Sequence, residues 1–169
     1  MTIDQANDLV RALIGEDDYH YGADAFMSYY DIAQKQIATT VSPIKKSFTI
    51  TGPQVVTMPQ DMYRLTGCDK SYRKIDDTHI EVEEHGDTNI RYFAYPCDIT
   101  PQTPVETSFE VSSEAQNAIP YFAAAHAVLA DSDMRRYYAF MDMYNNILQN
   151  ISAQDSGASI LTIIELGDK

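Results

Sequence analysis

Tryptophan is absent from the sequence, and basic residues are scarce. Twelve Lys and Arg residues stand against 25 Asp and Glu, which gives a formal net charge of −13 at pH 7. Because the largest basic run is the pair Lys45-Lys46, so acidic a chain should repel phosphate backbones, and we expect no free nucleic-acid binding. The acidity is most simply explained by solubility and self-avoidance.

Cysteine is rare as well. Cys68 and Cys97 are the only two, and neither lies in a C-x-x-C motif or near a histidine in the sequence. Two isolated thiols fit a reducing compartment, with a single disulfide between them as the alternative.

Long apolar runs are missing. No segment approaches the roughly 20 apolar residues of a membrane helix, and the acidic first 18 residues lack the positive charge of a signal peptide. We expect a soluble chain that is not exported and has no membrane contact. With 169 residues, 44% of them hydrophobic, the chain suits one globular domain with room for one appendage.

Helical periodicity is present at the start of the chain. Apolar residues recur at helical spacing over 3–14, where Gly15 should stop the helix. A second helix is predicted over 25–41, with Asp24 as its N-cap and Pro43 after its end.

The period then changes to that of strands. Short β-branched and aromatic runs separated by Gly, Pro, Asp or Asn fill 44–96, and Ile80 and Val82 alternate with glutamates as in an antiparallel strand with one wet face. These runs predict a small antiparallel sheet or squashed barrel, to which 107–111 is expected to add a last strand.

The stretch "VVTMPQDMYRLTGC" (55–68) interrupts this pattern. Pro59 and Asp61 predict a bend that re-aims a strand, with Tyr63 and Leu65 packed inward. The alternative is a ligand-binding loop.

Helix is predicted again from Ser113, where Ser113 and Gln116 fit a capping box. Pro120 lies either in the first turn of the helix or at a kink. The break at 131–133 is expected to cap a fourth helix.

After residue 151 the character changes once more. The sequence "SAQDSGAS" predicts a flexible linker, and the apolar run that follows it predicts a strand. This strand either joins the chain's own sheet or, as we favour, forms an arm that binds a partner. The expected partner-binding residues of the arm are Ile160, Leu161, Thr162, Ile163, Ile164 and Leu166.

Taken together, the pattern predicts an α+β fold: a four-helix bundle with an inserted antiparallel β-sheet or barrel and a C-terminal extended arm. The expected division is a helical core over 1–43 and 112–151, a β region over 44–111, and a linker and arm over 152–169.

Signatures of catalysis are missing. The sequence has no G-x-S-x-G, no phosphate loop, no G-x-G-x-x-G and no H-E-x-x-H, and its four histidines are scattered. Glu84 and His85 are adjacent, but neighbouring strand residues point to opposite faces, which argues against a shared metal ion. His126, on an apolar helical stripe, is interpreted as a core histidine. We expect no enzymatic activity, cofactor or metal, and we interpret the twelve tyrosines as packing, interface or carbohydrate-stacking residues.

Two helices, a β insertion, two helices and a tail make a distinctive order. The order resembles that of the head-to-tail adaptor (connector, or neck) proteins of tailed bacteriophages. The segments that carry the resemblance are "YYDIAQKQIATTVSPIKKSF", "TMPQDMYRLTGC", "IRYFAYPCDIT" and "AIPYFAAAHAVLADSDMRRYYAFMDMYNNIL".

The resemblance implies a structural virion protein, assembled in the bacterial host cytoplasm. About twelve copies would form a ring between the portal protein and the tail or the next neck protein. Genomic DNA would pass through the ring, and at ejection leave through it, without specific binding, helped by the negative charge. Two alternatives stay open: a small monomeric β-containing binding module that uses surface tyrosines for carbohydrate or peptide, and an enzyme with an unrecognised site.

Overall fold

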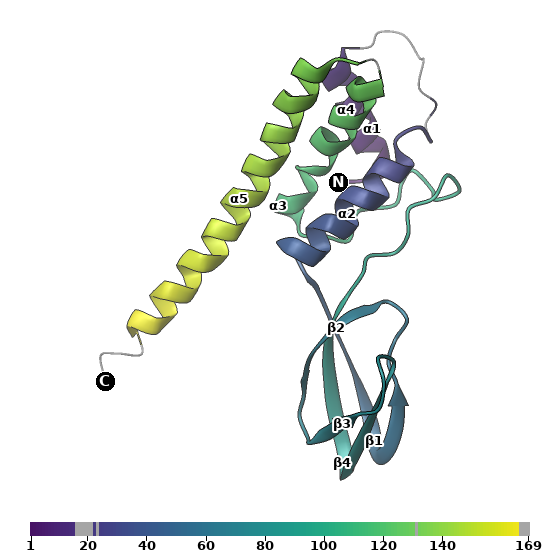
Figure 1. Cartoon of the computed structure of the whole chain (residues 1–169), viewed down its shortest axis with the longest axis vertical. Coiled ribbons are helices and arrows are strands. Elements are labelled where there is room, and N and C mark those ends of the chain that lie inside the picture. Colours follow the sequence, from purple (N-terminus) through teal and green to yellow (C-terminus); the bar gives the residue numbers. More distant parts are fainter. Residues whose placement is uncertain (16–21, 23, 131, 166–169) are drawn as a thin grey trace. The chain divides into compact units, whose positions relative to one another are not determined.

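The computed structural model describes residues 1–15, 22, 24–130 and 132–165, with the side chains of 130 and 154–165 left out of the description. The chain divides into two compact units (Figure 1). The helical unit comprises Met1–Ser42 and Asp98–Lys169, and the sheet unit comprises Pro43–Cys97. The segment 98–111, which the sequence analysis assigns to the β region, belongs to the helical unit.

The first helix, α1 (Ile3–Ile14), has the predicted bounds. Thr2 and Gln5 form a capping box at its start, in which each side chain accepts a hydrogen bond from the other residue's backbone N–H. Gly15 ends the helix at φ +73°, a left-handed conformation that glycine adopts without steric cost. At this end the Arg136 guanidinium donates a hydrogen bond of 2.9 Å to the Leu13 carbonyl oxygen.

The second helix, α2 (Met27–Thr40), begins two residues later and ends one residue earlier than predicted, and it buries Tyr30 and Ile37. The predicted N-cap is wrong. The residue at the N-cap position is Phe26, which has no capping hydrogen bond, and the Asp24 contribution is its backbone carbonyl, which accepts from Met27 N–H.

Helix resumes with a single turn, α3 (Ser113–Gln116), and then α4 (Ile119–Ala130). Pro120 lies in the first turn of α4, where its missing N–H has no helical partner to lose. The predicted capping box is wrong, because the Gln116 side-chain amide instead donates to the carbonyl oxygens of Phe109 and Val111.

The predicted four-helix bundle is wrong. Helix α4 is central instead, and α1, α2 and α5 all contact it. Its consecutive residues Ala123, Ala124 and Ala125 are all buried, so the helix is covered all round rather than along one stripe. Small side chains on every face let three helices approach one, whereas a bundle needs four helices that each face a shared core.

The longest helix, α5 (Met134–Glu165), begins where Asp133 Oδ1 accepts a hydrogen bond of 3.1 Å from Arg136 N–H. Asp133 therefore caps this helix, as the break at 131–133 predicts. The predicted flexible linker and extended arm are wrong, because the backbone stays helical through the linker and on to Glu165. Helix α5 has 32 residues, about 48 Å, against 12 residues, about 18 Å, for α4.

The sheet unit contains β1 (Ile44–Thr57), β2 (Met62–Cys68), β3 (Tyr72–Lys74) and β4 (His79–Ala94). All pairings are antiparallel: β4 lies between β1 and β2, and β3 also pairs with β4. Ile80 and Val82 face the core, as their alternation predicts. The strand predicted over 107–111 does not form, and only an isolated bridge joins Ser108 to Thr2.

Strands β1 and β4 are irregular at the same point, where pairing moves from Gly52 opposite Gly86 to Gln54 opposite Val82. The strand halves on both sides of this irregularity contribute to one apolar core, built from Val56, Met58, Ile80, Val82 and Ile90 and flanked by Phe48, Ile50, Met62, Leu65 and Cys68. The predicted barrel is wrong: strand order β1-β4-β2, with β3 also on β4, leaves the sheet open.

Candidate partner-binding surfaces

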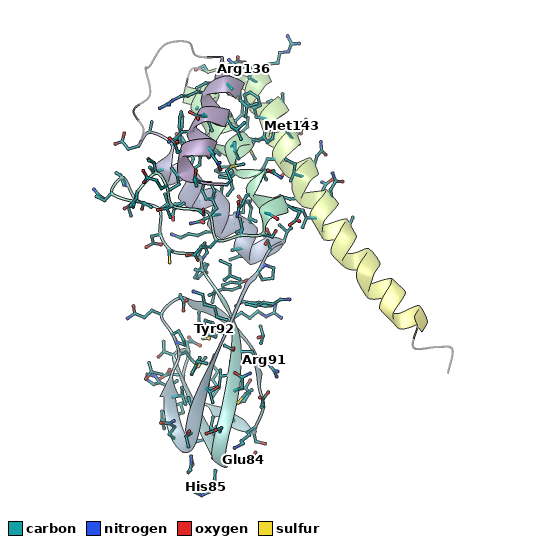
Figure 2. The ribbon with its side chains drawn as sticks, turned by 180° about the vertical axis from the view of Figure 1, so that it is seen from behind. Glu84, His85, Arg91, Tyr92, Arg136 and Met143 are labelled. Carbon is teal, nitrogen blue, oxygen red and sulfur yellow. The ribbon has the colours of Figure 1, made fainter. Side chains whose placement is uncertain are left out.

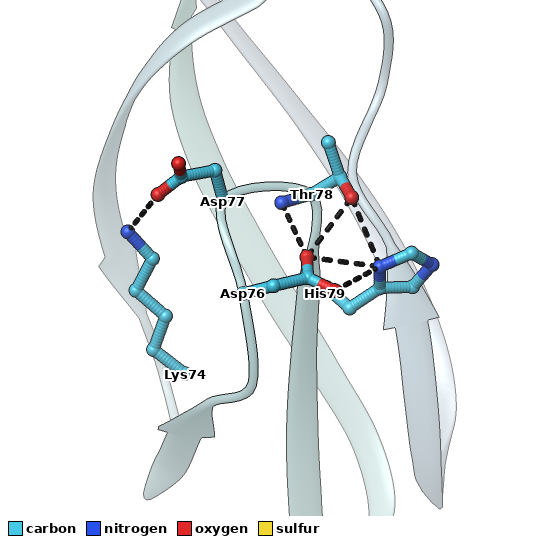
Figure 3. Close-up of polar contacts among 5 residues, drawn as sticks. All are labelled: Lys74, Asp76, Asp77, Thr78 and His79. Atoms are coloured by element: carbon cyan, nitrogen blue, oxygen red, sulfur yellow. Dashed lines mark hydrogen bonds and ion pairs between the residues drawn. The ribbon is translucent and has the colours of Figure 1, made fainter.

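The turn between β3 and β4 holds the acid–histidine pair that most resembles a catalytic group (Figure 3). The Asp76 carboxylate accepts hydrogen bonds from Thr78 N–H at 2.7 Å and from the Thr78 hydroxyl at 2.9 Å, and it lies 3.0 Å from His79 Nδ1. The backbone N–H of Thr78, then His79 and the Thr78 hydroxyl, lower the pKa of Asp76 to about 2. Asp77 pairs separately with Lys74 at 2.7 Å. All these bonds close the turn on itself, so the pair is explained by turn chemistry.

His126 lies among aromatic rings in the helical unit. Its ring stacks on Tyr29 at 5.3 Å, packs 4.5 Å from Phe122 and meets Tyr137 edge-on at 5.9 Å. Burial lowers its pKa, and no carboxylate orients the ring within the described part of the chain. His126 therefore packs among aromatic rings, but it is half-buried and not the core histidine that the sequence predicts. His20 lies outside the described residues.

Glu84 and His85 lie together at one end of the sheet unit (Figure 2). The Glu84 carboxylate accepts from Ser71 N–H at 3.1 Å, and the His85 carbonyl oxygen accepts from the Lys70 ammonium at 2.5 Å. Both residues are exposed. Within the ranges that the structure describes, no three His, Cys, Asp or Glu side chains gather closely enough to hold a metal ion.

The predicted partner-binding residues fall near the end of α5. Ile160, Leu161, Thr162, Ile163 and Ile164 are helical, and Leu166 lies outside the described residues. Their role in binding stays a prediction. The sequence signal that favours helix here is weak, because Ser156, Gly157 and Ser159 all have low helix propensity.

Basic side chains gather on one face of the sheet unit, which sequence reasoning missed. On neighbouring strands Lys45 and Arg64 both pair with Phe93 of β4, so the three share the face that points away from the core. The Arg64 guanidinium lies 6.0 Å from the centre of the Phe93 ring. We call Lys45, Arg64, Arg91 and Phe93 the cationic face. Only the register of the three strands reveals this face, because its cations are far apart in the sequence.

The Arg91 side chain is held against β2 on this face. Its guanidinium lies against Gly67 of β2, where a Cβ would come within 3.2 Å of its nitrogen. Asp69 pairs with the same guanidinium at 2.9 Å, and 55% of the Arg91 side chain remains exposed. Figure 2 labels Arg91 on the sheet unit. Gly67 and Asp69 therefore fix the direction of a charge that still meets solvent.

A shallow cleft of about 370 Å³ lies along the cationic face. Lys45 and Arg91 contribute its charge, Ser47 and Thr66 its hydroxyl-bearing residues, and Phe93 an aromatic wall. Lys46 also borders the cleft, but its ammonium pairs with Asp61 at 2.8 Å.

Tyrosines extend the cleft's aromatic side. The Tyr63 ring lies 5.0 Å from Tyr95 and 6.1 Å from Phe93. The prediction that Tyr63 packs inward is wrong, whereas Leu65 does pack against the core. Register shifts between Met62 and Arg64 and between Leu65 and Gly67 break the simple alternation of β2, which separates the two side chains.

Charge is distributed unevenly between the two units. The sheet unit has seven basic and eight acidic residues, a net charge of −1, and the rest of the chain has five basic and seventeen acidic residues, a net charge of −12. Net charge should therefore repel phosphate backbones from the helical unit, but not from the sheet unit.

The helical unit has an apolar groove of about 280 Å³ between α1, α4 and α5, lined chiefly by Leu9, Leu13, Tyr121 and Ile147. Leu9 is 45% exposed at its edge. Helix α5 also presents Tyr138 and the labelled Met143 to solvent (Figure 2). These surfaces are mainly apolar.

Comparison with known proteins adds no assignment: no protein-family model and no curated protein matches the chain. Among the residues that the structure describes, no helix combines the length and the apolar character needed to cross a bilayer.

Proposed function

We propose that this chain is a structural subunit of the ring that connects the portal to the tail in a tailed bacteriophage particle. The ring extends the DNA channel and offers a docking surface to the next tail component. The subunits assemble in the host cytoplasm and remain in the virion. The proposal takes its class from the motif resemblance, and the order of two helices, a sheet and then further helices supports it.

The length of α5 carries the proposal. This helix exceeds the helix that it packs on by 20 residues, about 30 Å, and Figure 1 shows it running past α3 and α4 within the helical unit. Its last turns contain Ser156, Gly157 and Ser159, a composition that forms a marginal helix in isolation. A projecting, weakly self-stable helix ending in apolar residues suits a segment that is completed by a partner.

The distribution of charge supports a channel function. With a net charge of −12 in the helical unit of each copy, a ring of such units presents a repulsive surface to DNA, so DNA can pass without a binding site. Basic residues lining the bore of an assembled ring would contradict this part of the proposal.

The decisive experiment is mass photometry of the full chain, alone and mixed with purified portal rings. We expect ring-sized masses docked on the portal, whether or not rings also form in its absence. Deleting 153–169 should abolish docking on the portal while the thermal unfolding of the remaining helices stays unchanged, because the buried α5 residue Tyr144 precedes the deletion. A chain that remains monomeric in both conditions contradicts the proposal.

A binding module is the second candidate, favoured by the Tyr63–Tyr95–Phe93 group on the sheet unit. Tyr95 is 43% exposed and offers a stacking surface for a sugar or peptide. A stable monomer whose sheet-unit tyrosine resonances shift when an oligosaccharide or peptide library is added would favour this candidate over the ring.

A further inference from the structure

We propose that the cationic face of the sheet unit binds the acidic surface of the helical unit in a second copy of this chain. This inference rests on the assembly of copies in the proposed function, but not on the placement of the ring beneath a portal. It assigns an occupant to a sheet face that the proposed function leaves unused.

The cationic face is built for an anionic surface. Lys45 forms no ion pair with any described residue, the Arg64 guanidinium lies over the Phe93 ring, and Arg91 is held in place by Gly67 and Asp69. Guanidinium groups that are fixed before binding lose little entropy when a carboxylate arrives. The aromatic ring between the cations supplies apolar area at the centre of the contact.

The complementary surface is present on the same chain. Asp4 and Asp8 are exposed one turn apart on α1, and Glu106 is exposed on the segment whose Val105 carbonyl oxygen accepts from Asp4 N–H at 2.9 Å. None of these three carboxylates forms an ion pair within the described ranges. We call them the acidic face.

A contact between two different faces of identical copies is heterologous. Such contacts propagate from copy to copy and close into a ring when the rotation between copies permits it. A self-complementary contact would instead stop at a dimer. The separation of charge into a near-neutral sheet unit and a unit of −12 is therefore the arrangement that head-to-tail assembly needs.

Nucleic acid is the other polyanion that a cationic and aromatic sheet face can bind. The observations favour a second copy, because the rest of the chain carries a net charge of −12, which repels a long phosphate backbone. A protein surface of limited size meets only the cationic face.

The test uses charge reversal on the full chain. Lys45→Glu/Arg64→Glu reverses the cationic face, and Asp8→Lys/Glu106→Lys reverses the acidic face. Arg73→Glu/Lys74→Glu on β3 is the matched control, since it changes the net charge as much as the first variant does. Sedimentation velocity at 50 mM and 500 mM NaCl measures assembly.

We expect wild type and the β3 control to assemble, and to weaken at 500 mM NaCl. Each face variant alone should need at least a tenfold higher protein concentration to assemble. An equimolar mixture of the two should assemble as wild type does, because every contact in the mixture again joins opposite charges. Three outcomes would each overturn the inference: both face variants assemble as wild type does, the mixture does not assemble, or wild type is monomeric.

Two further outcomes separate the alternatives. Wild type that assembles by itself but never docks on portal rings contradicts the proposed function and leaves this inference standing. Binding of a labelled single-stranded oligonucleotide at 50 mM NaCl that Lys45→Glu/Arg64→Glu abolishes would assign the face to nucleic acid and overturn the second copy as its occupant.

Discussion

The Tyr30 hydroxyl on α2 donates a hydrogen bond of 2.9 Å to Asn7 Oδ1 on α1, and both side chains are buried. Burial raises the pKa of the Tyr30 phenol, because the phenolate would have to form away from water. This hydrogen bond therefore joins α1 and α2 in the buried interior of the helical unit.

Replacing two buried tyrosines should give opposite results. Tyr30→Phe removes the donor to Asn7 and should lower the free energy of unfolding by about 1 kcal/mol. The Tyr144 hydroxyl is buried without a hydrogen-bond partner in the described part of the chain, and burial raises its pKa to about 12. Tyr144→Phe should therefore be neutral or stabilising by up to about 1 kcal/mol. Urea unfolding of the three proteins measures the difference, and a larger loss for Tyr144→Phe would contradict the assignment.

Alanine-to-leucine substitutions should show that α4 is covered on every side. Because Ala123, Ala124 and Ala125 point in three directions and are all buried, each substitution should destabilise by about 1–3 kcal/mol. Ala139→Leu, at an exposed position on α5, is the control and should have little effect. Tolerance of any one of the three in thermal unfolding would mean that one side of α4 is open.

The acid stability of the sheet unit should depend on Asp76. Its pKa is about 2 in the folded chain and 3.8 ordinarily, so its contribution to stability is complete above about pH 4 and is lost as pH falls towards 2. The difference in melting temperature between wild type and Asp76→Asn should shrink over this window. Asp77→Asn is the neighbouring control. A difference that stays constant from pH 5 to 2 would exclude the turn network as its source.

His126 should produce a second pH dependence, in the helical unit. Burial among Tyr29, Phe122 and Tyr137 lowers its pKa below the ordinary 6.5. The unfolded chain therefore takes up a proton first, and stability should fall as pH drops through 6.5. His126→Phe and His126→Gln should both lose this slope relative to wild type in melting curves between pH 7.5 and 5. A slope that persists in both variants would assign it to other groups.

A proline at position 158 should distinguish the helix from an extended arm. Ala158→Pro removes a backbone donor and clashes with the preceding turn of α5, so circular dichroism at 222 nm should fall while the main thermal transition stays in place. Ala158→Gln should keep the full helical signal. An unchanged spectrum for the proline variant would show that the segment is not helical in solution.

Local chemistry is enough to set several features of this protein from the sequence. Gly15 ends α1 because no other residue adopts a left-handed backbone so readily, and Ile80 and Val82 turn inward because strand side chains alternate. The α+β class and the antiparallel sheet follow from the same periodicities. The acidity and the missing catalytic motifs also come from composition.

Tertiary structure decided the rest, because the deciding contacts join residues that are distant in the sequence. Two register shifts in β2 separate Tyr63 from Leu65, and the pairing of three strands brings Lys45 and Arg64 to Phe93. Alanines buried on all sides of α4 made it a central helix. Local sequence determines which backbone conformations are low in free energy. Strand register and packing select among them, and their free energies depend on residues that lie far apart in the sequence.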